Sequence, residues 1–97
     1  MTKVTCEPQS YRITIEGHSG SAPKGEDLVC AAVTALGLTL AEFVEGRCVD
    51  RIIEIRDGFI CVQGDKSTAQ AFDVIRCGFR MLAEMYPEHV VCADKFV

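Results

Sequence analysis

Two residues in the first third of the chain have the side chains that nucleophilic catalysis needs. His18 follows a segment rich in β-forming residues, and Cys30 lies in the apolar run at residues 28–32. An imidazole that takes the proton of a thiol produces a nucleophile, and it can then protonate the leaving group. If the fold brings them together, these two side chains predict hydrolysis of a peptide bond through a cysteine.

The element that must carry Cys30 is a helix. Asp27 is a good N-cap residue, and the apolar residues that follow it predict a helix starting at Leu28. Cys30 would then lie in the first turn, where free N–H groups and the helix dipole favour a thiolate and can stabilise an oxyanion. The negative charge of the Asp27 carboxylate disfavours a thiolate at Cys30. Hydrogen bonds from helix N–H groups to this carboxylate would reduce that effect.

A loop of small residues joins His18 to this helix. Glycine near both ends favours a loop that closes over an extended peptide, so we expect it to contact the substrate. Its residues are Ser19, Gly20, Ser21, Ala22, Pro23, Lys24 and Gly25. The sequence does not decide which residue orients His18, and the candidates are Glu16, Glu26 and Asp27.

Both residues also have an ordinary structural interpretation. A histidine in a glycine-rich turn is commonly solvated, and a cysteine in an apolar run commonly belongs to the core. The chain has six cysteines, none of them in a CxxC or zinc-ribbon spacing, and five lie among apolar neighbours that predict burial. We therefore expect no metal and no cofactor, and we expect His89, in a loop, to be structural.

The remaining elements predict a two-layer α/β sandwich with a mainly antiparallel sheet and the order β-β-α-β-β-α-β, in one domain over residues 1–97. Strands are expected at 2–7, 11–16, 48–56, 59–63 and 90–93. Asp57-Gly58 is a hairpin signal between the third and fourth strands. Ser67 and Gln70 fit a capping box for a second helix that runs to about Tyr86. The helical period predicts an apolar stripe on it at Ala71, Phe72, Ile75, Phe79 and Leu82, and a solvated side at Asp73, Arg76, Arg80 and Glu84.

The first helix is apolar on every side from Leu28 to Ala41. One sheet covers only one side of a helix, so the other side needs a cover. The small residues Cys30, Thr34, Gly37 and Ala41 recur at helical spacing and would allow another backbone to approach closely. We therefore predict a homodimer through this stripe; the alternative cover is the second helix of the same chain.

Charge and composition narrow the classes of function. The net charge is −4 and the basic residues are scattered, which argues against direct binding of nucleic acid. Residues 1–7 are typical of a strand rather than of a signal peptide, and no apolar run appears long enough to span a membrane. These features predict a cytoplasmic protein with reduced thiols.

The segment ITIEGHSGSAPKGEDLVCAAVTAL resembles the signature of the Prp family of ribosomal-processing cysteine proteases. Gly17-His18 and the run from Asp27 to Thr34 match that signature in order and in spacing. The resemblance implies a cytosolic homodimer with His18 as general base and Cys30 as nucleophile, and with supporting roles for Asp27 and Thr34. It implies removal of an N-terminal extension from a large-subunit ribosomal protein. The loop departs from the family, which commonly has Ala after the histidine and an aromatic residue further along.

Two other functions remain open at this stage. A ribosome-associated module could bind a basic peptide through the loop without any chemistry. A thiol redox sensor would need a second cysteine to resolve the oxidised one, and none is close to Cys30 in the sequence.

Overall fold

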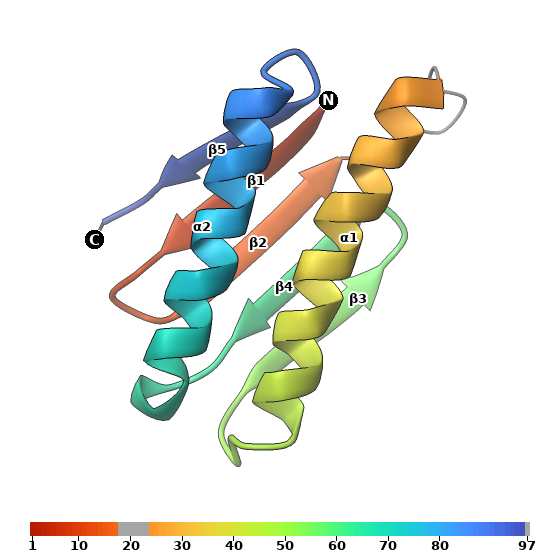
Figure 1. Ribbon diagram of the computed structural model, residues 1–97. Helices are drawn as coiled ribbons and strands as arrows, with labels where there is room; N and C mark the ends of the chain where they lie inside the picture. Colours follow the sequence, from red (N-terminus) through yellow and green to blue (C-terminus); the bar gives the residue numbers. More distant parts are fainter. Residues whose placement is uncertain (18–23, 97) are drawn as a thin grey trace.

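A computed structural model of the chain describes residues 1–17 and 24–96, and for residues 24–27 it describes the backbone alone. Two helices lie side by side on one face of a five-stranded sheet (Figure 1). This is the predicted two-layer α/β sandwich. Its elements are β1 (Thr2–Glu7), β2 (Arg12–Gly17), α1 (Lys24–Glu45), β3 (Ile52–Arg56), β4 (Phe59–Gln63), the short 3₁₀ helix η1 (Lys66–Thr68), α2 (Ala69–Met85) and β5 (Val90–Asp94).

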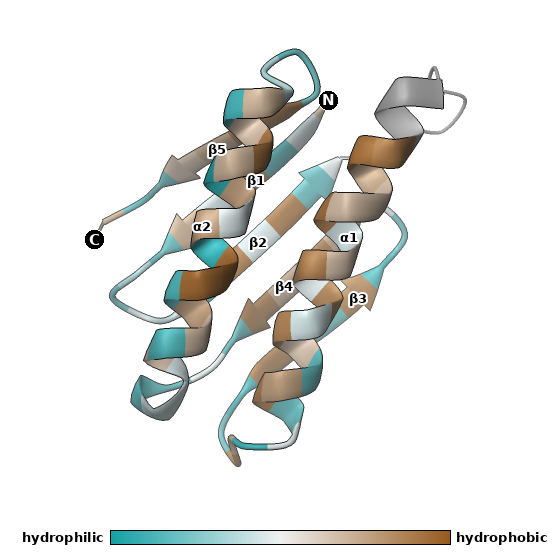
Figure 2. Ribbon diagram, viewed as in Figure 1, coloured by the Kyte–Doolittle hydropathy of each residue, from teal (hydrophilic) through white to brown (hydrophobic). Residues whose placement is uncertain are grey.

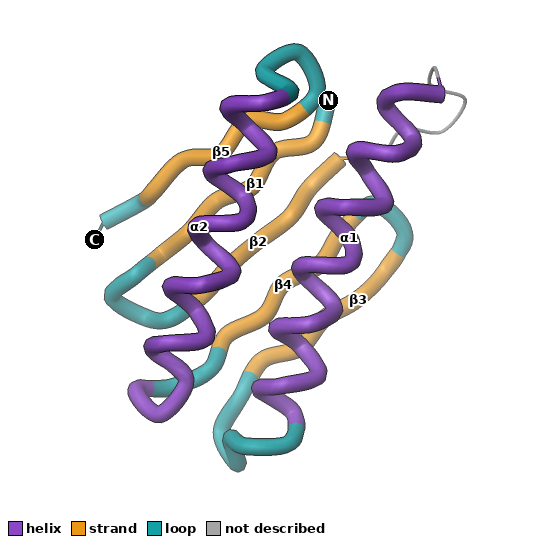
Figure 3. The backbone as a smooth tube through the Cα atoms, in the orientation of Figure 1, coloured by secondary structure: helices purple, strands orange, loops and turns teal. Residues whose placement is uncertain are grey.

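The strands lie in the order β3-β4-β2-β1-β5, which Figure 3 traces as a tube. All neighbouring strands are antiparallel except β1 and β5, which run parallel. The prediction of a mainly antiparallel sheet is therefore confirmed. The first strand of the chain is an inner strand, held by β2 on one side and by the last strand on the other.

Local sequence explains the second hairpin. Gly58 has a φ of 72°, which glycine adopts without steric cost, and Asp57-Gly58 joins β3 directly to β4. The strand before this turn is shorter than predicted. Cys48 does not begin it, because the Cys48 N–H donates to the Val44 carbonyl at 2.8 Å and so closes the end of α1.

The core lies between the sheet and the helices. Alternate side chains of β1, β2 and β4 belong to the buried core, and the predicted apolar stripe of α2 packs with them. Figure 2 shows hydrophobic residues along the strands and along both helices. Phe72, Ile75, Phe79 and Leu82 of that stripe are buried. The stripe was predicted correctly because it repeats at the helical period.

The start of α1 differs from the prediction. The helix already includes Lys24, so Asp27 is its fourth residue and not its N-cap. Acidic residues are favoured in a first helical turn, and the sequence Glu26-Asp27 suits that position as well as it suits a cap. Lys24 and Gly25 therefore belong to the helix and not to the predicted substrate loop.

The capping box was also predicted in the wrong register. It joins Asp65 and Thr68 and caps η1, with the Ser67 N–H donating to Asp65 Oδ1 at 2.8 Å and the Asp65 N–H to Thr68 Oγ1 at 3.2 Å. Ser67 and Gln70 do not form it. A short 3₁₀ turn precedes α2, and so the cap lies before that turn.

The small-residue stripe of α1 lies against the chain's own sheet. Gly37 and Ala41 are buried, and a Cβ at Gly37 would lie 2.6 Å from Ile15 Cδ1 of β2. The half of the stripe at Gly37 and Ala41 is therefore not available to a second subunit, whereas Cys30 is half-buried and Thr34 is exposed. Five of the exposed residues of α1 recur at spacings of three and four along the helix, and we call this set the outer stripe of α1: Leu28, Ala31, Ala35, Leu38 and Glu42.

Within the described residues, Leu28–Glu45 of α1 is long and apolar enough to cross a membrane by length and composition. The prediction that no apolar run reaches this length is wrong by that measure. Core helices of soluble proteins pass the same test, and Val29, Val33, Leu40 and Val44 of this helix are buried in the core. The helix is weak evidence for a membrane.

The cysteines are less uniformly buried than predicted. Cys6, Cys48 and Cys61 are buried, Cys30 and Cys92 are half-buried, and Cys77 is exposed on α2. Apolar neighbours in the sequence predicted burial, but the outward face of a helix still exposes whichever residue falls on it.

Candidate active site

A cleft of about 420 Å³ opens between α1 and one end of the sheet. Its walls come from the N-terminal half of α1, the ends of β2 and β3 and the starts of β1 and β4. Most of its lining is apolar. The lining residues are Thr2, Ile15, Gly17, Cys30, Val33, Thr34, Leu38, Ile55, Arg56, Asp57, Gly58, Phe59 and Ile60.

Cys30 lies in the α1 wall of this cleft and is half-buried. Thr34 is one helical turn further along and lines the same cleft. Asp27 precedes Cys30 by three residues, which places all three positions on one face of the helix. The helix therefore brings the predicted nucleophile and its predicted supporting positions to one side.

His18 and residues 19–23 of the predicted substrate loop lie outside the described residues. The residue before His18 is described, and it lines the cleft. The Gly17 N–H donates to the Gly58 carbonyl at 3.0 Å, and Gly17 pairs with Thr2 in the sheet.

The longer helix changes the electrostatics expected at Cys30. Counted from Lys24, Cys30 is the seventh residue of α1 and lies beyond the first turn. The dipole effect falls off within that turn, and an amide this deep in a helix donates to the carbonyl four residues earlier. The backbone N–H of Cys30 is therefore committed to the helix, and the prediction that first-turn N–H groups surround the thiol is wrong.

One polar neighbour of Cys30 was not predicted from the sequence. Thr2 Oγ1 lies 3.5 Å from Cys30 Sγ, and Thr2 is 4% exposed. These residues are far apart in the chain, and their contact depends on β1 lying between β2 and β5. The one available signal was a threonine at the first position of the predicted strand 2–7. The sequence does not show which helix packs against that threonine.

An arginine forms the outer rim of the cleft. The Arg56 guanidinium stacks over the Phe59 ring at 4.2 Å and lies 3.5 Å from Glu54 Oε2. Both charged side chains are more than half exposed, so the ion pair adds little stability. The stacking fixes the position of a cation beside an otherwise apolar cleft.

A pair of interacting thiols lies away from the cleft. Cys92 of β5 interacts with the thiol of Cys6, and this contact, with the nearby Arg80 and Arg76, lowers the pKa of Cys92 to about 7. The same interaction and burial raise the pKa of Cys6. A chemical test of Cys30 must therefore count the modification of Cys92 separately.

A compact two-layer domain with a cysteine in the wall of a peptide-sized cleft is the architecture of a small cysteine protease. The family model described as "Cysteine protease Prp" matches residues 1–91. The chain belongs to this family and is a cysteine protease.

Individual relatives agree. The chain is 30% identical over 91 residues to the ribosomal processing cysteine protease Prp of Mycoplasma genitalium, covering 86% of this chain and 87% of that protein. The fold is similar to that of the S. aureus protease Prp solved with a substrate peptide, with a TM-score of 0.81 at 18% identity over 98% of this chain and 100% of the other. It is also similar to SMU.848 of Streptococcus mutans, with a TM-score of 0.76 at 24% identity over 99% and 93% of the two chains.

Proposed function

We propose that residues 1–97 act as a single protease domain that removes an N-terminal extension from a large-subunit ribosomal protein, with Cys30 as nucleophile and His18 as general base. The observation that carries the proposal is that Cys30 and Gly17, the residue before His18, line one cleft. The relatives named for ribosomal processing support the choice of substrate.

The chemistry is that of an acyl-transfer enzyme. His18 takes the proton of the Cys30 thiol, and the sulfur attacks the carbonyl carbon of the scissile bond. The bond to the amine breaks as His18 returns the proton to the leaving nitrogen, which leaves a thioester on Cys30. Water, deprotonated by His18, then releases the acid and restores the thiol.

The cleft suits an extended chain. A volume of about 420 Å³ with a mostly apolar lining is in the range of roughly 300–1,000 Å³ that binding sites occupy. The cleft is bordered by strand ends and the β3–β4 turn, so a peptide can enter along the sheet end. The loop over residues 19–23 begins two positions after Gly17, which lines the cleft, and this supports its proposed role in covering the substrate.

A homodimer through the outer stripe of α1 is part of the proposal. Its positions 28, 31, 35, 38 and 42 alternate spacings of three and four, which is the pattern of a helix–helix seam. Leu28 is 69% exposed and Leu38 is 42% exposed, and pairing with a second copy would bury both. Cytoplasmic location, with no membrane and no nucleic-acid contact, remains part of the same proposal.

The test is cleavage of a peptide that carries the N-terminus encoded for the host's ribosomal protein. We expect one cut by the unaltered protein, read by mass spectrometry, and none by Cys30→Ala or His18→Ala. Cys77→Ala is the matched control, because it removes an exposed thiol on α2 and should cleave normally. Cleavage by Cys30→Ala would refute the assigned nucleophile, and an uncut peptide with all four proteins would refute the substrate.

A further inference from the structure

Thr2 is one of two buried polar residues among those whose burial the structure describes, and its hydroxyl faces the thiol of Cys30. The Oγ1–Sγ distance is 3.5 Å, within the range for a hydrogen bond to sulfur, and either atom can be the donor. A buried hydroxyl needs a partner, and the thiol provides one. The contact joins the first strand to the helix that forms the opposite wall of the cleft.

The sheet holds this hydroxyl in place. Thr2 pairs with Gly17 of β2 on one side and with Val90 of β5 on the other, and its N–H donates to the His89 carbonyl at 2.8 Å. A β-branched side chain has few rotamers, so a fixed backbone also fixes Oγ1. Figure 1 shows the start of β1, next to the N label, at the same end of the molecule as the end of β2 and the first turns of α1.

We propose that Thr2 is a positioning residue for the reaction of Cys30, which rests on the proposed role of Cys30 as nucleophile. In the resting enzyme the Thr2 hydroxyl donates to the sulfur, which favours the thiolate and holds Sγ in one rotamer towards the Gly17 side of the cleft. As the sulfur bonds to the substrate carbon, its charge disappears and this hydrogen bond weakens. The hydroxyl proton stays on Thr2 throughout.

This role predicts effects that simple packing would not produce. Thr2→Val keeps the shape and removes the donor, whereas Thr2→Ser keeps the donor. A hydrogen bond to a charged group contributes enough that its loss should slow a thiolate reaction about fivefold at neutral pH. The loss should appear in kcat while KM stays unchanged, because Thr2 is almost fully buried and its hydroxyl contacts the sulfur of Cys30.

The experiment measures alkylation of Cys30 by iodoacetamide across pH, quantified by peptide mapping so that Cys92 and Cys77 are counted separately. We expect Thr2→Val to slow alkylation of Cys30 about fivefold at neutral pH and to move its rate profile to higher pH, with Thr2→Ser close to the unaltered protein. Thr14→Val is the matched control, because it removes the hydroxyl that donates to Cys61 Sγ at 3.8 Å, on the face of the sheet away from the helices. It should leave Cys30 unchanged.

Superimposed profiles for Thr2→Val and the unaltered protein would overturn the proposal, as would equal slowing in Thr2→Val and Thr14→Val. If Thr2→Val does not fold, Thr2→Ala removes the same hydroxyl without added bulk and gives the same readout. Peptide cleavage with Cys30→Ala distinguishes failure of the proposed nucleophile from failure of the proposed role of Thr2. An active Cys30→Ala protein overturns the nucleophile, whereas an inactive one beside an unchanged Thr2→Val profile overturns the role of Thr2 alone.

Discussion

Gly37 of α1 lies directly over Ile15 of β2, so that a Cβ at position 37 would come within 2.6 Å of Ile15 Cδ1. The absence of a side chain lets the helix approach the sheet at the level of the cleft. Ile15 is 5% exposed and belongs to the core beneath the helix. The close approach of α1 to β2 therefore depends on a glycine in the middle of a helix, a position where glycine is otherwise unfavourable.

Gly37→Val should destabilise the protein by about 1–3 kcal/mol, the usual cost of overpacking a core. Gly46→Ala is the control, since a Cβ there would meet its nearest atom only at 3.7 Å, outside the core. Urea unfolding monitored by circular dichroism gives both values. Equal stability of Gly37→Val and the unaltered protein would mean that α1 is not held at this distance.

Gly17→Ala should damage both stability and activity. Gly17 has a φ of 127°, and a Cβ would lie 2.4 Å from the Met1 carbonyl oxygen, so the strand start that carries Thr2 would have to move. We expect a loss of about 1–3 kcal/mol, together with loss of peptide cleavage. Gly58→Asn is the comparison, because a φ of 72° suits asparagine. Thermal unfolding and cleavage rates on both variants test this, and a stable, active Gly17→Ala protein would contradict it.

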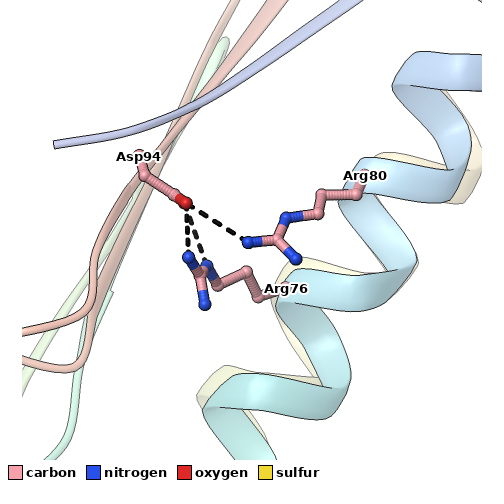
Figure 4. Close-up of polar contacts among 3 residues, drawn as sticks. All are labelled: Arg76, Arg80 and Asp94. Atoms are coloured by element: carbon pink, nitrogen blue, oxygen red, sulfur yellow. Dashed lines mark hydrogen bonds and ion pairs between the residues drawn. The ribbon is translucent and has the colours of Figure 1, made fainter.

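Asp94 of β5 is held by two arginines of α2. It accepts hydrogen bonds from Arg76 Nε at 2.9 Å and from Arg80 Nη2 at 3.2 Å, and Arg76 makes a second contact with it (Figure 4). Arg76 was predicted on the solvated side of its helix, and the structure uses it to attach the last strand. The hydrogen bonds from Arg76 and Arg80 lower the pKa of the Asp94 carboxyl.

A carboxyl whose pKa is lower in the folded state stabilises the fold above its unfolded pKa, and this contribution is lost as the pH falls through the folded pKa. Asp94→Asn should therefore cost about 1 kcal/mol at neutral pH and progressively less in acid. Glu54→Gln, at the exposed pair with Arg56, should change nothing measurable. Unfolding midpoints across pH measure the difference, and a constant gap between Asp94→Asn and the unaltered protein down to acid pH would argue against the ion pair.

Cys92 should be alkylated readily near neutral pH. Its pKa of about 7 leaves about half of it as thiolate there, so its rate should rise through neutrality and level off above. Arg80→Gln removes one of the cations that lower this pKa and should move the rise to higher pH. Peptide mapping after brief treatment with iodoacetamide reads the profile. A profile for Cys92 no different from that of exposed Cys77 would contradict the prediction.

The proposed dimer predicts a change in mass when the outer stripe of α1 is charged. Leu28→Lys places an ammonium group in the proposed interface and should shift the protein from dimer towards monomer in sedimentation experiments. Val49→Lys is the control, because Val49 is 92% exposed and follows α1 outside the stripe. An unaltered protein that sediments as a monomer at micromolar concentration would refute the interface.

The sequence predicted those parts of the fold that depend on local patterns. The hairpin at Asp57-Gly58, the buried stripe of α2 and the last strand all have short-range signals, and all are confirmed. The start of α1 was predicted too late in the sequence, because Asp27 suits both the N-cap and the first turn of a helix. The stripe containing Gly37 was assigned to a partner because small residues permit close approach without specifying what approaches.

The same holds for the candidate site: features with a local sequence pattern could be predicted, and contacts between distant elements could not. A histidine that follows a strand and a cysteine in the helix after the next loop can be predicted from the sequence, because strand and helix signals flank that loop. Thr2 could not be found in this way, since its proximity to Cys30 follows from the position of β1 within the sheet. Contacts between elements distant in sequence depend on topology, and topology has no local signal here.

The parallel pairing of β1 with β5 has a consequence for the order of events during synthesis. Thr2 is anchored by His89 and Val90, near the opposite end of the described chain, so contacts of large sequence separation complete the wall of the cleft. Folds that rely on such contacts form slowly and only after the distant segment is available. A nascent chain whose β5 has not yet left the ribosome therefore lacks the complete wall of the cleft. We expect proteolytic activity to appear only after that strand has been synthesised and has left the ribosome.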